Sequence, residues 1–181
     1  MSITTLTRPD INLRSEPQLS VKEYPIIRTA DQEDLDQLGQ LWLMQRIYHQ
    51  KWDEIYANAP SAVELWKKQV ERSFTIPTEQ IFVAEDETGR IIGYVAGGIY
   101  PWPMSPFQRY GSLNTIAIAN RARGRGIGKQ LAQALLTWFQ SEQIQYVSLH
   151  VDYRNEIALQ LYHSLGFRPY QERLMLTLKN S

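Results

Sequence analysis

The sequence predicts a single α/β domain built on a mixed sheet. Three observations support this prediction. Apolar runs rich in β-branched residues alternate with stripes at helical spacing, in the order β-α-α-β-β-β-α-β-α-β. The 181 residues suit one compact domain with a sizeable core. No internal repeat or interdomain linker interrupts the pattern, so residues 25–181 are expected to form the domain, after a loosely ordered extension over residues 1–24.

The first half of the domain is expected to form a strand, two helices and a hairpin. "YPIIRT" predicts the strand, and Thr29 with Gln32 resembles a capping box that opens a helix. Ser61 with Glu64 resembles a second capping box, which precedes a second helix. The apolar stripes of the two helices are Leu35, Leu38, Leu41 and Trp42, then Trp66, Val70 and Phe74. "QIFVAED" and "RIIGYVAGGIY", separated by "ETG", predict the hairpin.

The second half alternates strands with helices. Residues 110–119 predict a strand, and a helix starts inside the glycine-rich stretch "RARGRGIGK" at residues 121–129. "IQYVSLHV" at residues 144–151 alternates as a strand does. The next helix ends at Gly166, in the position that tolerates a left-handed backbone. "QERLMLTL" at residues 171–178 is expected to close the chain as a last strand.

Composition and charge argue against several classes of protein. The 19 Lys and Arg balance 19 Asp and Glu, whereas a nucleic-acid partner demands many phosphate-neutralising cations. There is no cysteine, and the three histidines show no HExxH pairing, so no metal site is expected. The chain shows no signal peptide and no apolar run of the roughly 20 residues that cross a bilayer. We therefore expect a cytoplasmic protein with no membrane or nucleic-acid partner.

The glycine-rich stretch predicts an anion site. The first N–H groups of a helix have no internal partners, and the helix dipole is positive there. Arg123, Arg125 and Lys129 can add charge-assisted hydrogen bonds to a phosphate or pyrophosphate. "GIGKQ" lacks the hydroxyl of a P-loop, and the three glycines give G-x-G-x-G rather than the dinucleotide fingerprint. The alternative is a flexible surface turn with solvated arginines.

Two segments resemble a known family. "IAIANRARGRGIGKQLAQALLTWF" resembles the acetyl-CoA signature R/Q-x-x-G-x-G/A of the GNAT superfamily of N-acetyltransferases, with Arg123, Gly126 and Gly128 at its fixed positions. "LHVDYRNEIALQLYHSLGF" resembles the second signature, in which Asn155 precedes a helix that bears Tyr162 and ends in Leu-Gly-Phe. The resemblance covers roughly residues 26–178. It implies a mostly antiparallel sheet flanked by helices, with a V-shaped opening between the strands before and after the acetyl-CoA loop.

The resemblance also implies acetyl-CoA as co-substrate, without a metal. The strand that ends at residues 116–118 would pair with the pantetheine arm as an added strand does. The loop at residues 123–129 would hold the pyrophosphate, and Asn155 would lie near the pantetheine arm. The cofactor-binding residues implied are Ile116, Ala117, Ile118, Arg123, Gly124, Arg125, Gly126, Ile127, Gly128, Lys129, Asn155 and Tyr162.

The implied reaction is direct attack of a primary amine on the acetyl thioester in a ternary complex. By resemblance, Tyr162 is the acid for the leaving thiolate, although its place on an apolar stripe alone would make it a core residue. A backbone N–H near Ile118 is expected to stabilise the oxyanion.

The general base stays open. Residues 110–119, where many members of the superfamily carry a glutamate, contain no acid. His150 stands twelve residues before Tyr162, where the bacterial ribosomal-protein alanine acetyltransferases carry a glutamate. The alternatives are a structural role for His150, Asp152 as the base, or a chain of water molecules.

The acceptor is expected to be a small-molecule or peptide amine. "WLMQRIYHQKWDEIY" and "YPWPMSPFQRY" are aromatic-rich and suit a flat or apolar-bodied amine, whose cation Asp53 and Glu54 can attract. Trp42 and Trp52 are alternatively core residues, and His49 is expected to be a solvated helix residue. A homodimer is compatible with the sequence. A function of another class also stays open, namely an acetyl-CoA-binding regulatory or sensor module without turnover.

Overall fold

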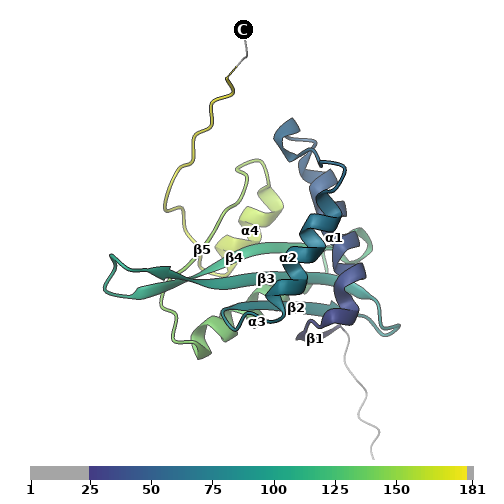
Figure 1. Cartoon of the computed structure of the whole chain (residues 1–181), viewed down its shortest axis with the longest axis horizontal. Helices are drawn as coiled ribbons and strands as arrows, with labels where there is room; N and C mark the ends of the chain where they lie inside the picture. The colour runs from purple at the N-terminus through teal and green to yellow at the C-terminus, as the bar shows by residue number, and fades with distance from the viewer. Residues whose placement is uncertain (1–24, 179–181) are drawn as a thin grey trace, which may run out of the picture.

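The computed structural model describes residues 25–178, so the extension expected over residues 1–24 lies outside the described residues. One sheet carries five strands in chain order: β1 (Ile26–Thr29), β2 (Glu79–Glu85), β3 (Ile91–Trp102), β4 (Gln108–Ile118) and β5 (Val147–Leu149). The helices are α1 (Leu35–His49), α2 (Ala62–Ser73), α3 (Ile127–Ser141) and α4 (Glu156–Ser164), with short 3-10 turns η1 (Gln32–Asp34), η2 (Glu54–Tyr56) and η3 (Asn120–Ala122). Figure 1 shows the helices arranged around the sheet.

The sheet is mixed and mostly antiparallel, as expected. Neighbouring strands from β1 to β4 pair antiparallel, and only β5 runs parallel to its neighbour β4. The β2–β3 hairpin turns at Gly89, which has a φ of 77° that glycine adopts at no steric cost. The parallel pair needs a crossover, and helix α3 supplies it between β4 and β5.

Each face of the sheet carries its own core. On one face, Leu38 of α1 packs in a cluster with Val83 and Tyr94 of the sheet. On the other face, Leu131 of α3 packs with Val95 of β3 and Tyr162 of α4. Because successive strand residues point to opposite faces, cluster membership shows which way each strand side chain points.

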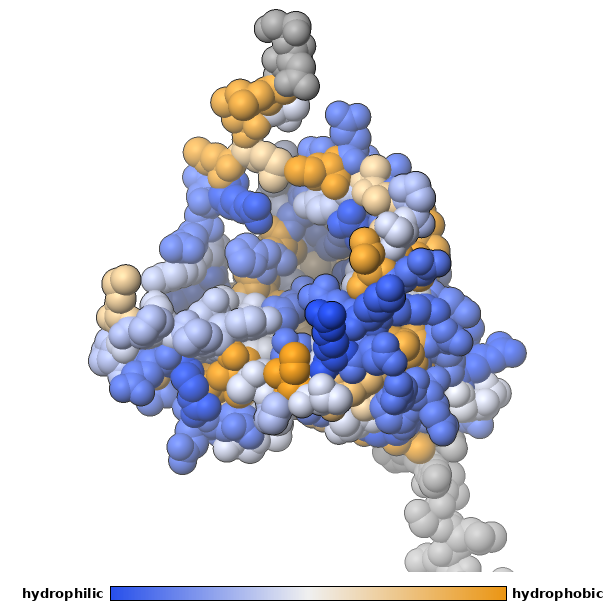
Figure 2. Space-filling view, viewed as in Figure 1, coloured by the Kyte–Doolittle hydropathy of each residue, from blue (hydrophilic) through white to orange (hydrophobic). Residues whose placement is uncertain are grey.

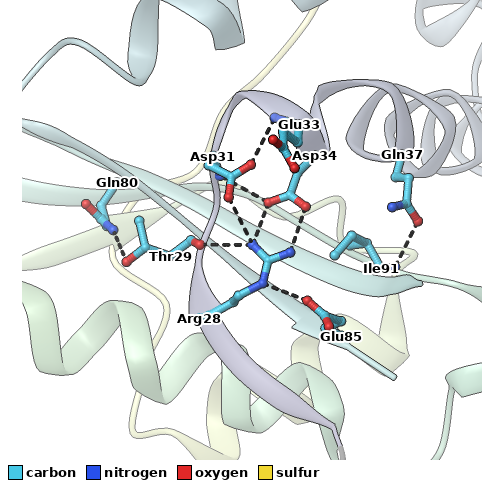
Figure 3. A network of polar contacts seen from close by, with 9 residues as sticks. All are labelled: Arg28, Thr29, Asp31, Glu33, Asp34, Gln37, Gln80, Glu85 and Ile91. Carbon is cyan, nitrogen blue, oxygen red and sulfur yellow. Dashed lines mark hydrogen bonds and ion pairs between the residues drawn. The ribbon is translucent and has the colours of Figure 1, made fainter. Parts of the chain in front are cut away.

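The first helical segment starts differently from the expectation. The capping box is Asp31 with Asp34, because the Asp31 carboxylate accepts from Glu33 N and Asp34 Oδ2 accepts from Asp31 N. Thr29, the expected cap, instead accepts a hydrogen bond from Gln80. Figure 3 shows this network. Ser61 does precede α2 as expected, but its side chain makes no capping bond.

Two further expectations need correction at the C-terminal end. Strand β5 has three residues rather than the eight of "IQYVSLHV". The expected last strand over residues 171–178 does not form, and its Leu174, Met175, Leu176 and Leu178 are 62–85% exposed. Figure 2 shows these apolar side chains on the projecting C-terminal segment. Apolar residues favour a strand only when a neighbour supplies pairing, and this segment has none among the described residues. Gly166 is confirmed after α4, with a φ of 91°.

Candidate active site

The site begins at a bulge in strand β4. Ala96 and Gly97 are consecutive in β3, but their partners in β4 are Thr115 and Leu113, which leaves Asn114 as an extra residue. A bulge of this kind shifts the alternation of the strand by one residue. After it, the N–H of an odd-numbered residue points to the opposite edge of the strand from the N–H of an odd-numbered residue before it. Before it, the Gly111 N–H bonds Tyr146 O on the β5 side; after it, the Ala119 N–H bonds Ile92 O on the β3 side.

Beyond the bulge, β4 has a free edge that turns its backbone groups away from β3. Strand β5 pairs only with Gly111–Leu113, so within residues 25–178 no strand pairs with that side of β4 from there to Ile118. Two carbonyls on this edge accept hydrogen bonds from side chains: Ile116 O from Gln45 Nε2 at 2.9 Å, and Ile118 O from Arg123 Nε at 3.3 Å. This divergence of β4 from β5 confirms the expected V-shaped opening. Its edge presents the hydrogen-bonding groups that an added strand would use.

The free edge leads into the glycine-rich loop. Gly124 and Gly126 both have a φ of 75°, and no atom lies within 4 Å of the place where a side chain would start. The first helical hydrogen bonds of α3 run from Lys129 N and Gln130 N to Gly126 O. The N–H groups of the two preceding residues therefore lack helical partners, at the positive end of a helix dipole. Such a loop fits the anion that the sequence predicts there.

The side chains in this loop have different surroundings. Ile127 is 1% exposed and anchors the start of α3 in the core, whereas Arg125 and Lys129 are exposed. The guanidinium of Arg123 lies 5.0 Å from the ring centroid of Tyr48 on α1. At Gly128, a methyl group would come within 3.4 Å of Leu161 of α4. The N-terminus of α3 therefore lies close to α4 here, with room left for an ordinary side-chain contact.

The second predicted segment provides a cap and a buried phenol. The Asn155 side chain accepts a hydrogen bond from Ala158 N and caps α4, so its amide is engaged in the fold. Tyr162 is 7% exposed, with its ring 5.9 Å from that of Phe167, and burial raises the pKa of its hydroxyl to about 12. Among the described residues, only the Tyr94 hydroxyl is both sealed from solvent and without a partner. The Tyr162 hydroxyl is therefore not a polar group that is sealed in the core without a hydrogen-bond partner.

The two candidate base residues differ in their surroundings. His150 lies just beyond β5 and is exposed. The Asp152 carboxylate accepts hydrogen bonds from Arg154 and, at 3.2 Å, from the Tyr56 hydroxyl, and Arg154 is the main cause that lowers its pKa to about 2. Such a carboxylate holds a proton too weakly to serve as a base near neutral pH.

Asp152 and Arg154 also tie the segment after α1 to the segment after β5. Arg154 Nη1 donates to Trp52 O at 2.6 Å, while Tyr56 bonds Asp152. His49 stacks on Trp52 with ring centroids 5.0 Å apart. The expectation of a solvated His49 is therefore wrong. Burial is the main cause that lowers the pKa of His49, and the positive charge of nearby Arg46 lowers it further.

The remaining acceptor-side candidates have structural contacts. Trp42 stacks on Trp66 at 5.3 Å beside the core, which supports the core reading of this residue. Asp53 caps η2 by accepting from Ile55 N, and Glu54 is exposed. Gln45 and Asn114 are the residues that the sequence analysis missed. Neither stands in a sequence motif. Their roles depend on the bulge in β4, and no pattern in the sequence marks that bulge.

This arrangement matches a known family. The profile of the acetyltransferase (GNAT) family matches residues 41–167, which include the bulge, the glycine-rich loop and α4. The chain belongs to the GNAT acetyltransferase family. The match extends over more than half of the chain and confirms the resemblance seen in the two sequence segments.

Curated GNAT relatives are similar over part of their length. A mycothiol acetyltransferase of Renibacterium salmoninarum is 36% identical over 85 residues, which are 47% of this chain and 25% of the relative. The uncharacterized N-acetyltransferase YobR of Bacillus subtilis is 33% identical over 69 residues, which are 38% of this chain and 28% of the relative. The matched segments thus span about a quarter of the length of these curated relatives.

Solved structures share the fold over most of the chain. A "probable acetyltransferase" superposes with a TM-score of 0.67 at 27% identity, covering 86% of this chain and 98% of the other. The BH1408 protein of Bacillus halodurans gives 0.75 at 23% identity, over 84% and 99% of the two chains. AAC(6')-Iy in complex with a CoA-containing bisubstrate analogue gives 0.64 at 19%, over 88% and 100%. The last two comparisons show the GNAT fold alone.

Two findings concern the described residues as a whole. No helix within residues 25–178 has the length and apolar character to cross a membrane. In the same part of the chain, no three His, Asp or Glu side chains gather as ligands of a metal ion would.

Proposed function

We propose that this protein is an acetyl-CoA-dependent N-acetyltransferase, which acts on a primary amine by direct attack in a ternary complex. One observation carries the proposal: the free edge of β4 after the bulge leads directly into the glycine-rich start of α3. A strand edge that ends at an anion site suits a ligand with an amide-bearing arm and a diphosphate. The pantetheine arm and diphosphate of coenzyme A have this order.

Two groups of residues would hold the carrier. The backbone of Ile116 and Ile118 would bond its amides, after Gln45 and Arg123 share or release the two carbonyls. Gly124, Gly126 and the N–H groups of Ile127 and Gly128 would surround the diphosphate. Arg123, Arg125 and Lys129 would contribute charge-assisted hydrogen bonds. Acetyl-CoA supplies the activated acyl group as a thioester.

Tyr162 is the proposed acid. In the transfer, the amine nitrogen forms a bond to the acetyl carbon, the carbon–sulfur bond breaks, and the leaving thiolate takes a proton. A phenol with a pKa of about 12 keeps its proton at neutral pH and can donate it to that sulfur. A backbone N–H on the free edge of β4 would stabilise the oxyanion.

His150 is the proposed base. It is exposed beyond β5 and, unlike Asp152, forms no ion pair with any side chain of residues 25–178. A neutral imidazole can take the proton that the attacking amine loses, and histidine is suited to this near neutral pH. The acceptor would be a small-molecule amine, a class supported by the relatives named mycothiol acetyltransferase and by the acetylneamine-containing analogue bound to AAC(6')-Iy, which shares the fold.

The test separates an enzyme from a sensor. Release of free thiol from acetyl-CoA is measured across a panel of primary amines, with the amine omitted as control. Amine-dependent thiol release, with acetylated amine in equal amount, is expected. Tight binding of acetyl-CoA without amine-dependent release from any member of the panel would favour the regulatory module instead.

A further inference from the structure

The face of the long β3–β4 hairpin carries an aromatic surface. Ile99 and Leu113 belong to the core beneath α3, so Tyr100 and Asn114 point to the opposite face. Toward the hairpin tip, Trp102 lies 5.9 Å from Tyr110 and is 37% exposed. Figure 1 shows this hairpin reaching beyond the helices that cover the rest of the sheet.

Tyr100 lies flat along the strand because Gly98 leaves room for it. A methyl group at Gly98 would meet the Tyr100 hydroxyl at 3.0 Å and two ring carbons at 3.2 Å. The Tyr100 ring also packs against the Tyr110 ring, with centroids 5.8 Å apart. The ring is therefore held toward the body of the sheet, with its hydroxyl directed back along β3.

This hydroxyl reaches the bulge. Asn114 Nδ2 donates a hydrogen bond of 2.9 Å to the Tyr100 hydroxyl, and Asn114 is the extra residue that turns β4 outward. Two residues later, the free edge begins to present its carbonyls. The Tyr100–Asn114 pair thus stands beside the segment proposed to hold the thioester. The Asn114 amide oxygen and the Tyr100 hydroxyl hydrogen are not used in their mutual bond and can accept from and donate to a ligand.

The surface contains hydrogen-bonding groups and rings rather than charges. Its members are Gly98, Tyr100, Trp102, Tyr110 and Asn114. None of these residues has a carboxylate side chain, so no anion among them would draw in a polycation by charge. Flat rings with polar edges suit a ligand that has both an apolar face and hydroxyl groups.

We propose that Tyr100 and Asn114 determine acceptor specificity by holding the body of the amine. That body is an uncharged, hydroxyl-bearing ring, which lies against the Tyr100 ring and bonds Asn114. Gly98 serves this site by keeping Tyr100 in place. The inference rests on the proposed transfer to an amine and adds the class of acceptor.

The experiment compares glucosamine, an amine on an uncharged ring, with spermidine, a flexible polycation. Initial rates are measured for the wild type and for Tyr100→Ala, Tyr100→Phe, Asn114→Ala and Gly98→Ala. Tyr170→Ala is the matched control, because Tyr170 is 81% exposed on the C-terminal segment. The dissociation constant of acetyl-CoA and the melting temperature of each variant are recorded alongside.

The expected result is a higher kcat/KM for glucosamine than for spermidine in the wild type. Tyr100→Ala, Asn114→Ala and Gly98→Ala should each raise the KM for glucosamine about tenfold, while acetyl-CoA affinity stays within about twofold. Tyr100→Phe keeps the ring and should have a smaller effect than Tyr100→Ala.

Two results would overturn the inference: a preference for spermidine, or a glucosamine KM unchanged in Tyr100→Ala, Asn114→Ala and Gly98→Ala. Failure to acetylate any amine would instead refute the proposed function.

Discussion

The side-chain amide of Gln45, on α1, donates a 2.9 Å hydrogen bond to the carbonyl of Ile116, on β4. This bond links the helix on the proposed acceptor side to the free strand edge. Half-buried Gln45 satisfies a carbonyl for which the sheet supplies no partner. The edge, which β3 pairs on its other side, thus has one of its outward carbonyls bonded by a side chain from a distant part of the sequence.

Replacing Gln45 by Glu should destabilise the protein near neutral pH by about 1–3 kcal/mol. An ionised carboxylate cannot donate to the Ile116 carbonyl, whereas a protonated one can. The stability difference from the wild type should therefore shrink as pH falls, which urea unfolding at several pH values measures. Gln40→Glu, at an exposed position of the same helix, is the control. A difference that grows in acid would contradict the assigned role of Gln45.

Tyr162→Phe should lower kcat by about 10²-fold, because the leaving thiolate loses its proton donor. Acetyl-CoA affinity should change little. The pKa of about 12 means that the wild-type phenol stays protonated as pH rises toward that value. The pH profile of kcat/KM should therefore show no decline due to Tyr162 below about pH 10. Full activity in the variant would reduce Tyr162 to a packing residue.

Tyr94→Phe should leave stability unchanged or raise it by about 1 kcal/mol. The Tyr94 hydroxyl is sealed in the core beneath α1 and α2 and has no hydrogen-bond partner in the part of the chain that the structure describes, so removing it relieves a desolvation cost. Thermal unfolding measures the change. Tyr170→Phe, at an exposed position, should have no effect. A marked loss of stability in Tyr94→Phe would show that the hydroxyl has a partner in solution.

Asp34→Asn tests the ion pair in Figure 3. Arg28 donates to both oxygens of Asp34, at 2.7 and 2.8 Å, and also to Glu85. Removing the charge should cost about 2 kcal/mol, below the value for a fully buried pair, because the Arg28 side chain is one third exposed. Asp36→Asn, at an exposed position, should cost less than about 0.5 kcal/mol.

The pH dependence of this pair follows from the pKa of Asp34. Burial alone would raise that pKa, but hydrogen bonds from Arg28 and Asp31 outweigh it and hold it below the ordinary 3.8. The stabilisation is therefore present above the ordinary value and is lost as pH falls through the lower folded value. The difference between wild type and Asp34→Asn should disappear in acid. A difference that persists there would exclude the carboxylate charge as its source.

Local features of the fold were predictable from the sequence. The position of α3 inside the glycine-rich stretch and the left-handed Gly166 follow from helix periodicity and glycine chemistry. The prediction of a last strand over residues 171–178 was wrong, because alternating apolar residues indicate strand character but do not show whether a neighbouring strand is present to pair with. Asp31 rather than Thr29 forms the capping box, because Thr29 still belongs to β1, where it pairs with Phe82, and Asp34 lies where it can accept from Asp31 N.

The loop residues of the candidate site stood in recognisable motifs, but the groups around the bulge did not. The extra residue at Asn114 is defined only by pairing between two strands, and Gln45 reaches Ile116 across 71 positions of sequence. Tyr100 stood in the aromatic segment expected on the acceptor side, yet its contact with Gly98 and Asn114 depends on strand register. Such contacts are tertiary, so no local pattern predicts them.

The most direct test of the account is calorimetric titration of the purified protein with acetyl-CoA and with S-acetyl-N-acetylcysteamine, which carries the thioester but no diphosphate. We expect saturable binding of acetyl-CoA, at least tenfold tighter than the analogue, and a similar loss of affinity in Gly126→Val. Equal affinity for the two thioesters, or no uptake of acetyl-CoA at millimolar concentration, would contradict the claim that the β4–α3 loop binds the diphosphate.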